Sequence, residues 1–248
     1  MNFNPFKKKT THIDFYTFDA AYHKNDKPTL KADYPSWCKN MELAVKVDDK
    51  KFGTKFDVGT AKGCPGIKNF MKEGIKFHLW EELKLRIMPD GTVIILPLAF
   101  EPKNPPYVQH YPPQFTGMYP DNVAAFKLNT PWYGVCKDET SFIFVESHYS
   151  TRWFRENNAV IAPGYINFKY QHALNCHILM PTDKEPYDIT MPYGLPLFTL
   201  FPVSEKKLTI DHHAVTNEEM ANIGSPFPQC PVGKYYQYVK NMKGNSES

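Results

Sequence analysis

Alternation of apolar and polar residues is the clearest pattern along the chain, and it predicts a β-hairpin. Leu83, Leu85 and Ile87 alternate with charged residues, and the turn Pro89-Asp90-Gly91 then leads into the apolar segment 92–96. Alternation on both sides of an Asp-Gly turn is typical of two paired strands. Because the second strand is apolar on both faces, we expect it to lie inside a sheet.

Short apolar segments separated by Pro and Gly continue along the rest of the chain. We expect strands at 13–18, 41–47, 126–128, 141–145, 174–180, 187–190 and 195–201, with turns at 130–134 and 191–194. Many short strands between such turns are typical of a β-sandwich or barrel, so the predicted fold class is mainly β. Helical signals are few. They are one turn at 67–71 and two short C-terminal helices, 216–223 with a Thr cap and a Gly stop, and 234–243.

The distribution of Pro divides the chain into segments. Residues 97–122 contain seven Pro and form a Pro-rich bridge, because Pro cannot donate to a sheet ladder. We therefore predict an N-terminal β-hairpin half over 1–122 that includes this bridge, a β core over 123–210, and a helical extension over 211–248. A chain of 248 residues can hold these three segments in one compact unit.

Charge and composition narrow the class of protein. The net charge is only +3, and just three of the 29 basic residues are Arg. Arg provides the planar fork that reads phosphates and guanines, so its scarcity argues against a nucleic-acid partner. No apolar run reaches the ~18 residues of a membrane span, and no apolar segment follows the N-terminal lysines. We expect a soluble protein without a signal peptide or membrane partner.

The segment 126–206 carries a resemblance in the order of its strands and turns. Its most specific part is Pro163-Gly164-Tyr165-Ile166-Asn167, followed by Tyr170. This layout resembles the core of the trimeric dUTPase and dCTP-deaminase family, where a Pro-Gly-x-Ile-Asp-x-x-Tyr segment provides the general base and a Tyr that packs on the pyrimidine. The resemblance implies a β-clip core and a homotrimer. It also implies a ligand pocket near Tyr170, Asn167, Ser147 and His148.

Two positions of this chain lack the residues that carry out catalysis in that family. Asn167 stands where the family has its Asp, and an amide cannot accept the proton of an attacking water. The family's phosphate-binding Arg-Ser-Gly falls near Glu146-Ser147-His148, which has no Arg. The pocket could still bind a ligand through the Asn167 amide. We therefore expect no dUTP hydrolysis, and we predict no cofactor.

A second resemblance extends over about residues 60–205. It rests on Cys64-Pro65-Gly66-Ile67, the segment 74–80, Asn129-Thr130-Pro131-Trp132 and the segment 194–198. These motifs resemble an uncharacterised family encoded by large tailed phages of marine bacteria. That resemblance implies a viral origin and a location in the host cytoplasm or in the virion.

Histidines provide a candidate metal site. His172 and His177 lie five residues apart near a predicted strand, and an odd spacing places them on opposite faces, so these two alone cannot chelate. A metal site would need His148 or His110 brought in by the fold, with a carboxylate such as Glu146. Such a site, built on His148, His172 or His177, would suit a cupin-like barrel. Asp211-His212-His213 lies beside a predicted strand end, and we expect it in a solvated loop.

Three functions follow from these observations. The first is a non-enzymatic, virus-encoded β protein that acts through contacts with itself and with other viral or host proteins, as a virion component or an assembly or regulatory factor. The second is a nucleotide- or small-ligand-binding protein that has lost or altered hydrolysis. The third is a cupin-like metal-dependent enzyme.

Overall fold

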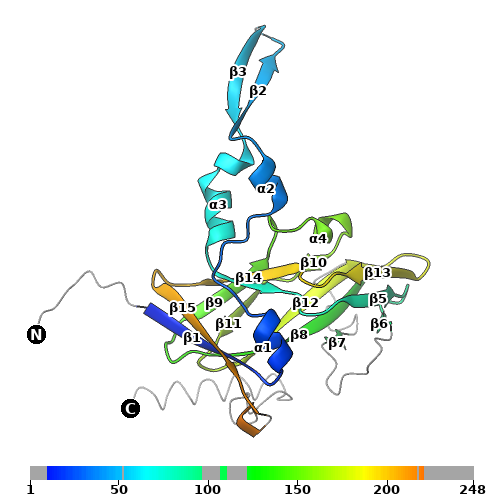
Figure 1. Ribbon diagram of the computed structural model, residues 1–248. Coiled ribbons are helices and arrows are strands. Elements are labelled where there is room, and N and C mark those ends of the chain that lie inside the picture. The colour runs from blue at the N-terminus through cyan, green and yellow to red at the C-terminus, as the bar shows by residue number, and fades with distance from the viewer. Residues whose placement is uncertain (1–9, 52, 97–106, 111–121, 217, 221–248) are drawn as a thin grey trace, which may run out of the picture.

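The protein is mainly β, and its strands form several open sheets in the computed structural model (Figure 1). The structure describes residues 10–51, 53–96, 107–110, 122–216 and 218–220. None of the sheets among these residues closes into a barrel. No helix in the described ranges is both long enough and apolar enough to cross a membrane.

The largest sheet contains strands from both ends of the chain. Its order is β10 (Val160–Ile161), β12 (Ala173–Pro181), β8 (Val123–Val135), β1 (Thr10–Thr17) and β15 (Lys207–Ala214), and β7 (Tyr107–His110) also pairs with β8. β1 and β15 are parallel, whereas the other pairs are antiparallel. The two ends of the described chain are therefore joined by a direct strand pair.

Two further sheets complete the body of the molecule. One has the order β11 (Gly164–Asn167), β9 (Ser141–Glu146), β14 (Pro196–Pro202) and β4 (Ile75–His78). The other has the order β13 (Tyr187–Met191), β5 (Leu83–Ile87) and β6 (Val93–Ile95). Each of these sheets combines strands from before and after residue 122, so the predicted segments 1–122 and 123–210 interleave.

The hydrophobic core contains residues of all three of these sheets, and aromatic rings join the largest sheet to the four-stranded one. Phe15 of β1 is fully buried, and its ring packs edge-on against Phe77 of β4 at 5.7 Å and Phe168 at 5.8 Å. Phe77 in turn stacks on Phe198 of β14 at 4.9 Å. Offset and edge-on ring pairs of this kind stabilise a packed interior. The alternating pattern of β1 thus sends its apolar side inward and leaves its polar side exposed.

A two-stranded sheet projects away from this body. β2 (Ala44–Asp49) and β3 (Thr54–Gly59) pair only with each other among the described strands, and they extend from one side of the molecule (Figure 1). They are carried by α2 (Ser36–Asn40), the 3₁₀ turn Ala61–Gly63 and α3 (Pro65–Lys72). The remaining helices are α1 (Ala20–Asn25) and α4 (Trp153–Glu156).

Aromatic contacts fix the base of this projection to the body. The indole Nε1 of Trp37 in α2 donates to the Tyr149 carbonyl at 2.8 Å. Phe70 of α3 packs against Tyr149 at 5.3 Å and against Phe201 of β14 at 5.0 Å. The projecting hairpin therefore rises from a base that is anchored in the body.

Most predicted strands are confirmed, and β8 is longer than predicted. The expected turn at 130–134 is wrong, because β8 continues through Pro131 to Val135. The pairing with β12 shifts register here, from Asn129 opposite Asn175 to Tyr133 opposite Ala173. Pro is tolerated within a sheet at such irregularities, since no ladder hydrogen bond is required of it.

The hairpin around Asp90-Gly91 is confirmed, but the expected position of its second strand is wrong. β6 lies at the end of the described three-stranded sheet instead of inside it, and Ile94 is 44% exposed. β6 is only three residues long. Apolar residues on both of its faces therefore did not mean that another strand pairs with each of its edges.

At the C-terminal end, a reciprocal cap marks the start of a helix. The Glu219 carboxylate accepts from the Thr216 backbone N–H at 2.8 Å, and the Glu219 N–H donates to Thr216 Oγ1 at 3.2 Å. This is the capping box that the sequence predicted. The end of that helix, the predicted helix 234–243, and the Pro-rich bridge other than residues 107–110 and 122 lie outside the described residues.

Candidate functional site

The residues of the predicted ligand pocket lie at two ends of one strand. Asn167 is paired with Ser141 at the start of β9, whereas Ser147 follows the end of β9. Six residues of extended chain span roughly 20 Å. The structure therefore brings Asn167 and Tyr170 together, but not with Ser147 and His148.

Each of these side chains has contacts within the fold. The Asn167 amide donates to Ser141 Oγ at 3.3 Å, and its carbonyl accepts from the Lys169 N–H at 3.0 Å. Tyr170 is 5% exposed, and its hydroxyl donates to Glu139 at 2.8 Å. These contacts fix the turn after β11. The Tyr170 ring belongs to the packed interior and does not present a stacking face to solvent.

At the other end of β9, Ser147 and His148 have separate environments. Ser147 is buried, and its hydroxyl is 3.3 Å from that of Thr199 in β14. His148 is half exposed, with Nδ1 3.5 Å from Glu146 Oε1. A half-exposed His148 thus lies beside a largely buried Glu146, next to the buried pair of Ser147 and Thr199.

The three histidines of the predicted metal site do not converge. His172 precedes β12, and its Nδ1 is 3.0 Å from the Gly134 carbonyl. His177 lies within β12, about 16 Å further along the extended chain. His148 follows a strand of the other large sheet. The structure places each of them in a different environment.

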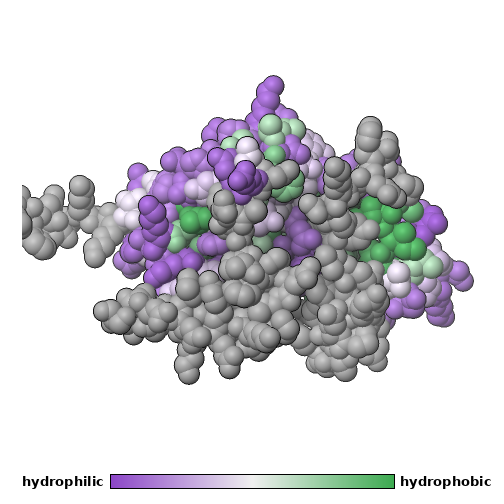
Figure 2. All heavy atoms as spheres, turned by 90° about the horizontal axis from the view of Figure 1, so that it is seen from below, coloured by the Kyte–Doolittle hydropathy of each residue, from purple (hydrophilic) through white to green (hydrophobic). Residues whose placement is uncertain are grey.

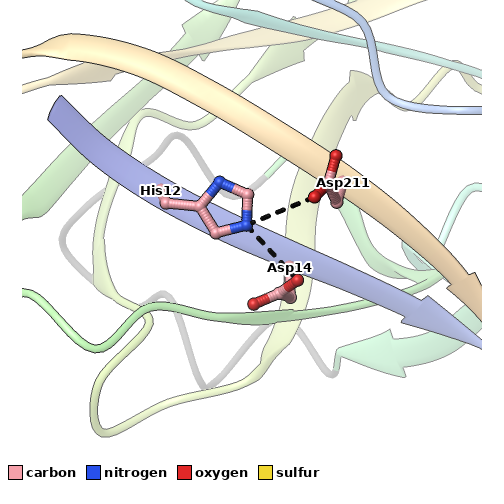
Figure 3. A group of neighbouring side chains, drawn as sticks. All are labelled: His12, Asp14 and Asp211. Carbon is pink, nitrogen blue, oxygen red and sulfur yellow. Dashed lines mark ion pairs between the residues drawn. The ribbon is translucent and has the colours of Figure 1, made fainter.

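A different His and Asp cluster lies on the outer face of β1 and β15. His12 and Asp14 are two residues apart on β1, so both side chains lie on the same face. The parallel register places Asp211 of β15 directly beside Asp14 and His213 beside Tyr16. Residues nearly 200 positions apart thereby share one small surface (Figure 3).

The expected solvated loop at 211–213 is therefore wrong, because these residues belong to β15. His212 points the opposite way from its neighbours and packs beside Phe15 with ring centroids 6.2 Å apart. Burial lowers the pKa of His212, and its Nε2 lies 2.8 Å from the Pro28 carbonyl. Sequence reasoning also overlooked the His-x-Asp spacing of His12-Ile13-Asp14. That spacing was visible in the chain, whereas its pairing with Asp211 was not.

A buried lysine forms a second group of interest. Lys76 of β4 is 2% exposed, and its Nζ donates to the carbonyls of Glu73 and Gly74. Burial lowers the pKa of Lys76 to about 8. Nearby, a hydrogen bond from His78 lowers the pKa of Asp33. The Glu73 and Gly74 carbonyls accept from the Lys76 ammonium and offset part of the cost of burying it.

The projecting hairpin has an apolar face that the described chain leaves uncovered. Val45 is paired with Val58, and Val47 with Phe56, so these four side chains lie on one side. Their exposed fractions are 43%, 37%, 40% and 49%, respectively. We call this surface the apolar hairpin face. Seen from the opposite end of the molecule, the described residues in view are mostly hydrophilic, and apolar residues gather in patches among them (Figure 2).

The other side of the hairpin is charged and balanced. Lys46 is paired with Asp57, and Asp48 with Lys55. The Lys55 Nζ lies 3.4 Å from Asp48 Oδ1. Cross-strand pairs of opposite charge favour the sheet, although exposed ion pairs contribute little individually. The hairpin is thus amphipathic, with a charged side that carries equal numbers of acids and bases.

Comparison with known proteins does not assign this chain to a group: no protein-family model and no curated protein matches its sequence.

Proposed function

We propose that this is a non-enzymatic protein that acts through protein contacts, and that its β2–β3 hairpin is the contact element. The observation that carries the proposal is the apolar hairpin face, which stands exposed on a two-stranded sheet. An isolated hairpin is at best marginally stable in water, and contiguous exposed apolar residues mark interaction surfaces. A partner strand added to this two-stranded sheet would stabilise the hairpin and bring the apolar side chains of the two molecules together.

The partner that fits best is the hairpin of a second copy of this chain. If the β3 strands of two copies pair antiparallel about Phe56, each Phe56 lies opposite the other. Lys55 of one copy then faces Asp57 of the second copy, and the two-fold axis repeats this pair. Thr54 faces Val58, and both are β-branched residues suited to strands. The charged sides and the apolar sides of the two hairpins therefore match.

The free edge of β2 fits a second copy less well. Antiparallel pairing about Val47 would place Lys46 opposite Asp48, which is favourable. It would also place Val45 opposite Asp49, so a carboxylate would lie against the apolar face. Moving a carboxylate from water onto an apolar surface is costly. We therefore assign the contact to β3, which would join two hairpins into a four-stranded sheet with one continuous apolar face.

A contact role for the hairpin is compatible with the fold and the viral role inferred from the sequence. The β-clip core and the role as a virus-encoded virion component or assembly factor rest on the two resemblances described above. The homotrimer implied by the dUTPase resemblance and the two-fold pairing of β3 are alternative assemblies. The mass of the assembly separates them.

Charge complementation at Phe56 tests this register directly. We expect the native chain to sediment as a dimer at micromolar concentration. Phe56→Lys and Phe56→Glu should each yield monomers, because like charges would face one another across the two-fold axis. An equimolar mixture of the two variants should associate again, because the introduced ammonium of one variant would oppose the introduced carboxylate of the other. Native mass spectrometry of differently tagged copies would identify the mixed dimer.

Matched substitutions at Tyr165 provide the control. Tyr165 is an aromatic residue on β11 that is 65% exposed, so Lys or Glu at this position should leave the assembly unchanged. A trimer that Phe56→Lys dissociates would support a contact role but overturn the two-fold register. If the native chain and the Phe56 variants are all monomeric, the proposed contact between two hairpins is overturned.

A further inference from the structure

We propose that His12, Asp14 and Asp211 form a binding site for a divalent transition-metal ion such as Zn²⁺, with His213 positioning Asp14. The site lies on the β1–β15 pair (Figure 3), at the edge of the largest sheet and apart from the projecting hairpin (Figure 1). It is independent of the proposed contact function.

The spacing of the candidate ligand atoms suits a metal ion better than direct hydrogen bonds. His12 Nε2 is 3.4 Å from Asp14 Oδ1 and 3.6 Å from Asp211 Oδ2, and the three ligand atoms lie within 4.8 Å of one another. N–H···O hydrogen bonds are usually about 2.7–3.2 Å long. Ligands held at about 2.1 Å from a tetrahedral Zn²⁺ lie about 3.4 Å apart. The imidazole and both carboxylates could therefore bind one ion with small adjustments.

The hydrogen bonds around the cluster orient the ligands toward a common point. Thr209 Oγ1 lies 2.9 Å from His12 Nδ1, so this ring nitrogen can donate to the hydroxyl. The other nitrogen, Nε2, then presents its lone pair toward the carboxylates, as a metal ligand must. His213 Nε2 is 2.8 Å from Asp14 Oδ1, and the His213 ring stacks on Tyr16 at 4.7 Å. Such outer contacts fix the orientation of metal ligands.

Electrostatics also favours a cation at this position. The parallel register places Asp14 and Asp211 side by side on adjacent strands. Like charges at neighbouring positions destabilise a sheet unless another charge compensates them. A divalent ion between the two carboxylates would provide that compensation. Imidazole and carboxylate together suit Zn²⁺, Ni²⁺ or Co²⁺ more than Mg²⁺, which prefers oxygen ligands and retained waters.

The cluster is open to solvent, so an ion can enter and water can occupy a remaining position. The side chains of His12 and Asp211 are 45% and 68% exposed, whereas Asp14 is 27% exposed between them. Among the described residues this is the group in which three such ligand atoms gather. The His148–Glu146 pair has a similar separation of 3.5 Å and a half-exposed imidazole, but it lacks a second carboxylate.

Calorimetric titration of the full chain with Zn²⁺ tests the proposal, with Mg²⁺ as the hard-cation comparison. We expect one Zn²⁺ per chain at this site and no comparable Mg²⁺ binding. His12→Ala and Asp211→Asn should each weaken that binding at least tenfold. His213→Ala should weaken it about tenfold, as outer-shell changes commonly do. His148→Ala is the matched control and should retain native affinity.

A second readout separates ligation from a change in folding. Co²⁺ should give the visible absorption of a low-coordinate N/O site with the native chain and with His148→Ala, but not with His12→Ala. Circular dichroism would show that the exposed His12→Ala and Asp211→Asn variants keep the native fold. Equal Zn²⁺ binding by the native chain, His12→Ala and Asp211→Asn would overturn the assignment, as would an absence of Zn²⁺ binding by the native chain.

Discussion

Two hairpins in this molecule share one pattern of side chains but have opposite environments. In the β5–β6 hairpin, Leu83, Leu85 and Ile87 are fully buried, and β13 pairs along the free side of β5. In the β2–β3 hairpin, Val45 and Val47 also alternate with charged residues, yet both are about 40% exposed and no third strand pairs among those described.

The difference shows what alternation can and cannot establish. A period of two indicates that a strand has one apolar face. Whether that face is covered depends on segments from elsewhere in the chain that pack against it, as the hydrophobic core does for Leu83, Leu85 and Ile87. Where the described chain supplies no cover, as for β2–β3, the pattern indicates a surface that another molecule can cover. The comparison therefore separates residues that stabilise the fold from residues available for contact.

Truncating one apolar side chain in each hairpin should give the largest difference. Leu85→Ala would leave a cavity in the core, and such changes lower the free energy of unfolding by about 2–5 kcal/mol. Val47→Ala truncates a side chain that is already 40% exposed and should cost about 0.5 kcal/mol at most. Urea unfolding at concentrations low enough to keep the chain monomeric would measure both. Equal losses would contradict the distinction between covered and uncovered hairpins.

Replacing a glycine by alanine should also destabilise the body more than the projecting hairpin, by a smaller amount than Leu85→Ala. A Cβ at Gly164 of β11 would lie 2.2 Å from the Phe144 ring of the paired strand, whereas a Cβ at Gly59 of β3 meets no atom within 4 Å. Overpacking of this kind costs about 1–3 kcal/mol. Gly164→Ala should therefore destabilise the body by this amount, and Gly59→Ala should stay within about 0.5 kcal/mol. Thermal unfolding of both variants beside the native chain would test this; a tolerated Gly164→Ala would show that Phe144 can move aside.

Local patterns predicted the local parts of this fold. The Asp90-Gly91 turn and the Thr216–Glu219 capping box are each specified by residues within a few positions, and the structure confirms both. The course of β8 through Pro131 could not be predicted in the same way, because it depends on the shifted pairing with β12.

The two surfaces proposed for function differ in how far the sequence could predict them, because they depend to different degrees on strands that pair from distant parts of the chain. The two faces of β2 and β3 follow from alternation, although their exposure required the fold. The metal-binding cluster depends on β1 and β15 lying parallel in register, which places Asp14 beside Asp211. No turn or spacing near either residue specifies that pairing. The His12-Ile13-Asp14 spacing was the one local signal for it.

Buried and exposed lysines should differ in how stability depends on pH. Burial lowers the pKa of Lys76 from 10.5 to about 8, so between these values the unfolded chain binds more protons at this residue than the folded chain. Stability then rises with pH across that window. Below pH 8 Lys76 is protonated in both the folded and the unfolded chain, so the folded chain bears the full free-energy cost of burying the ammonium. Lys76→Met removes this cost, so its stability relative to the native chain should fall as pH rises from about 8 toward 10.

The same substitution at Lys55 in the projecting hairpin is the matched comparison, because 71% of that side chain is exposed. Lys55→Met should shift stability by a small amount, because an exposed ion pair such as that of Lys55 with Asp48 contributes little. Urea unfolding in steps from pH 7 to pH 10 would measure the two differences. A pH-independent difference for Lys76→Met would mean that water reaches its ammonium in the folded chain, and that the body around β4 is more open than the contacts with Glu73 and Gly74 indicate.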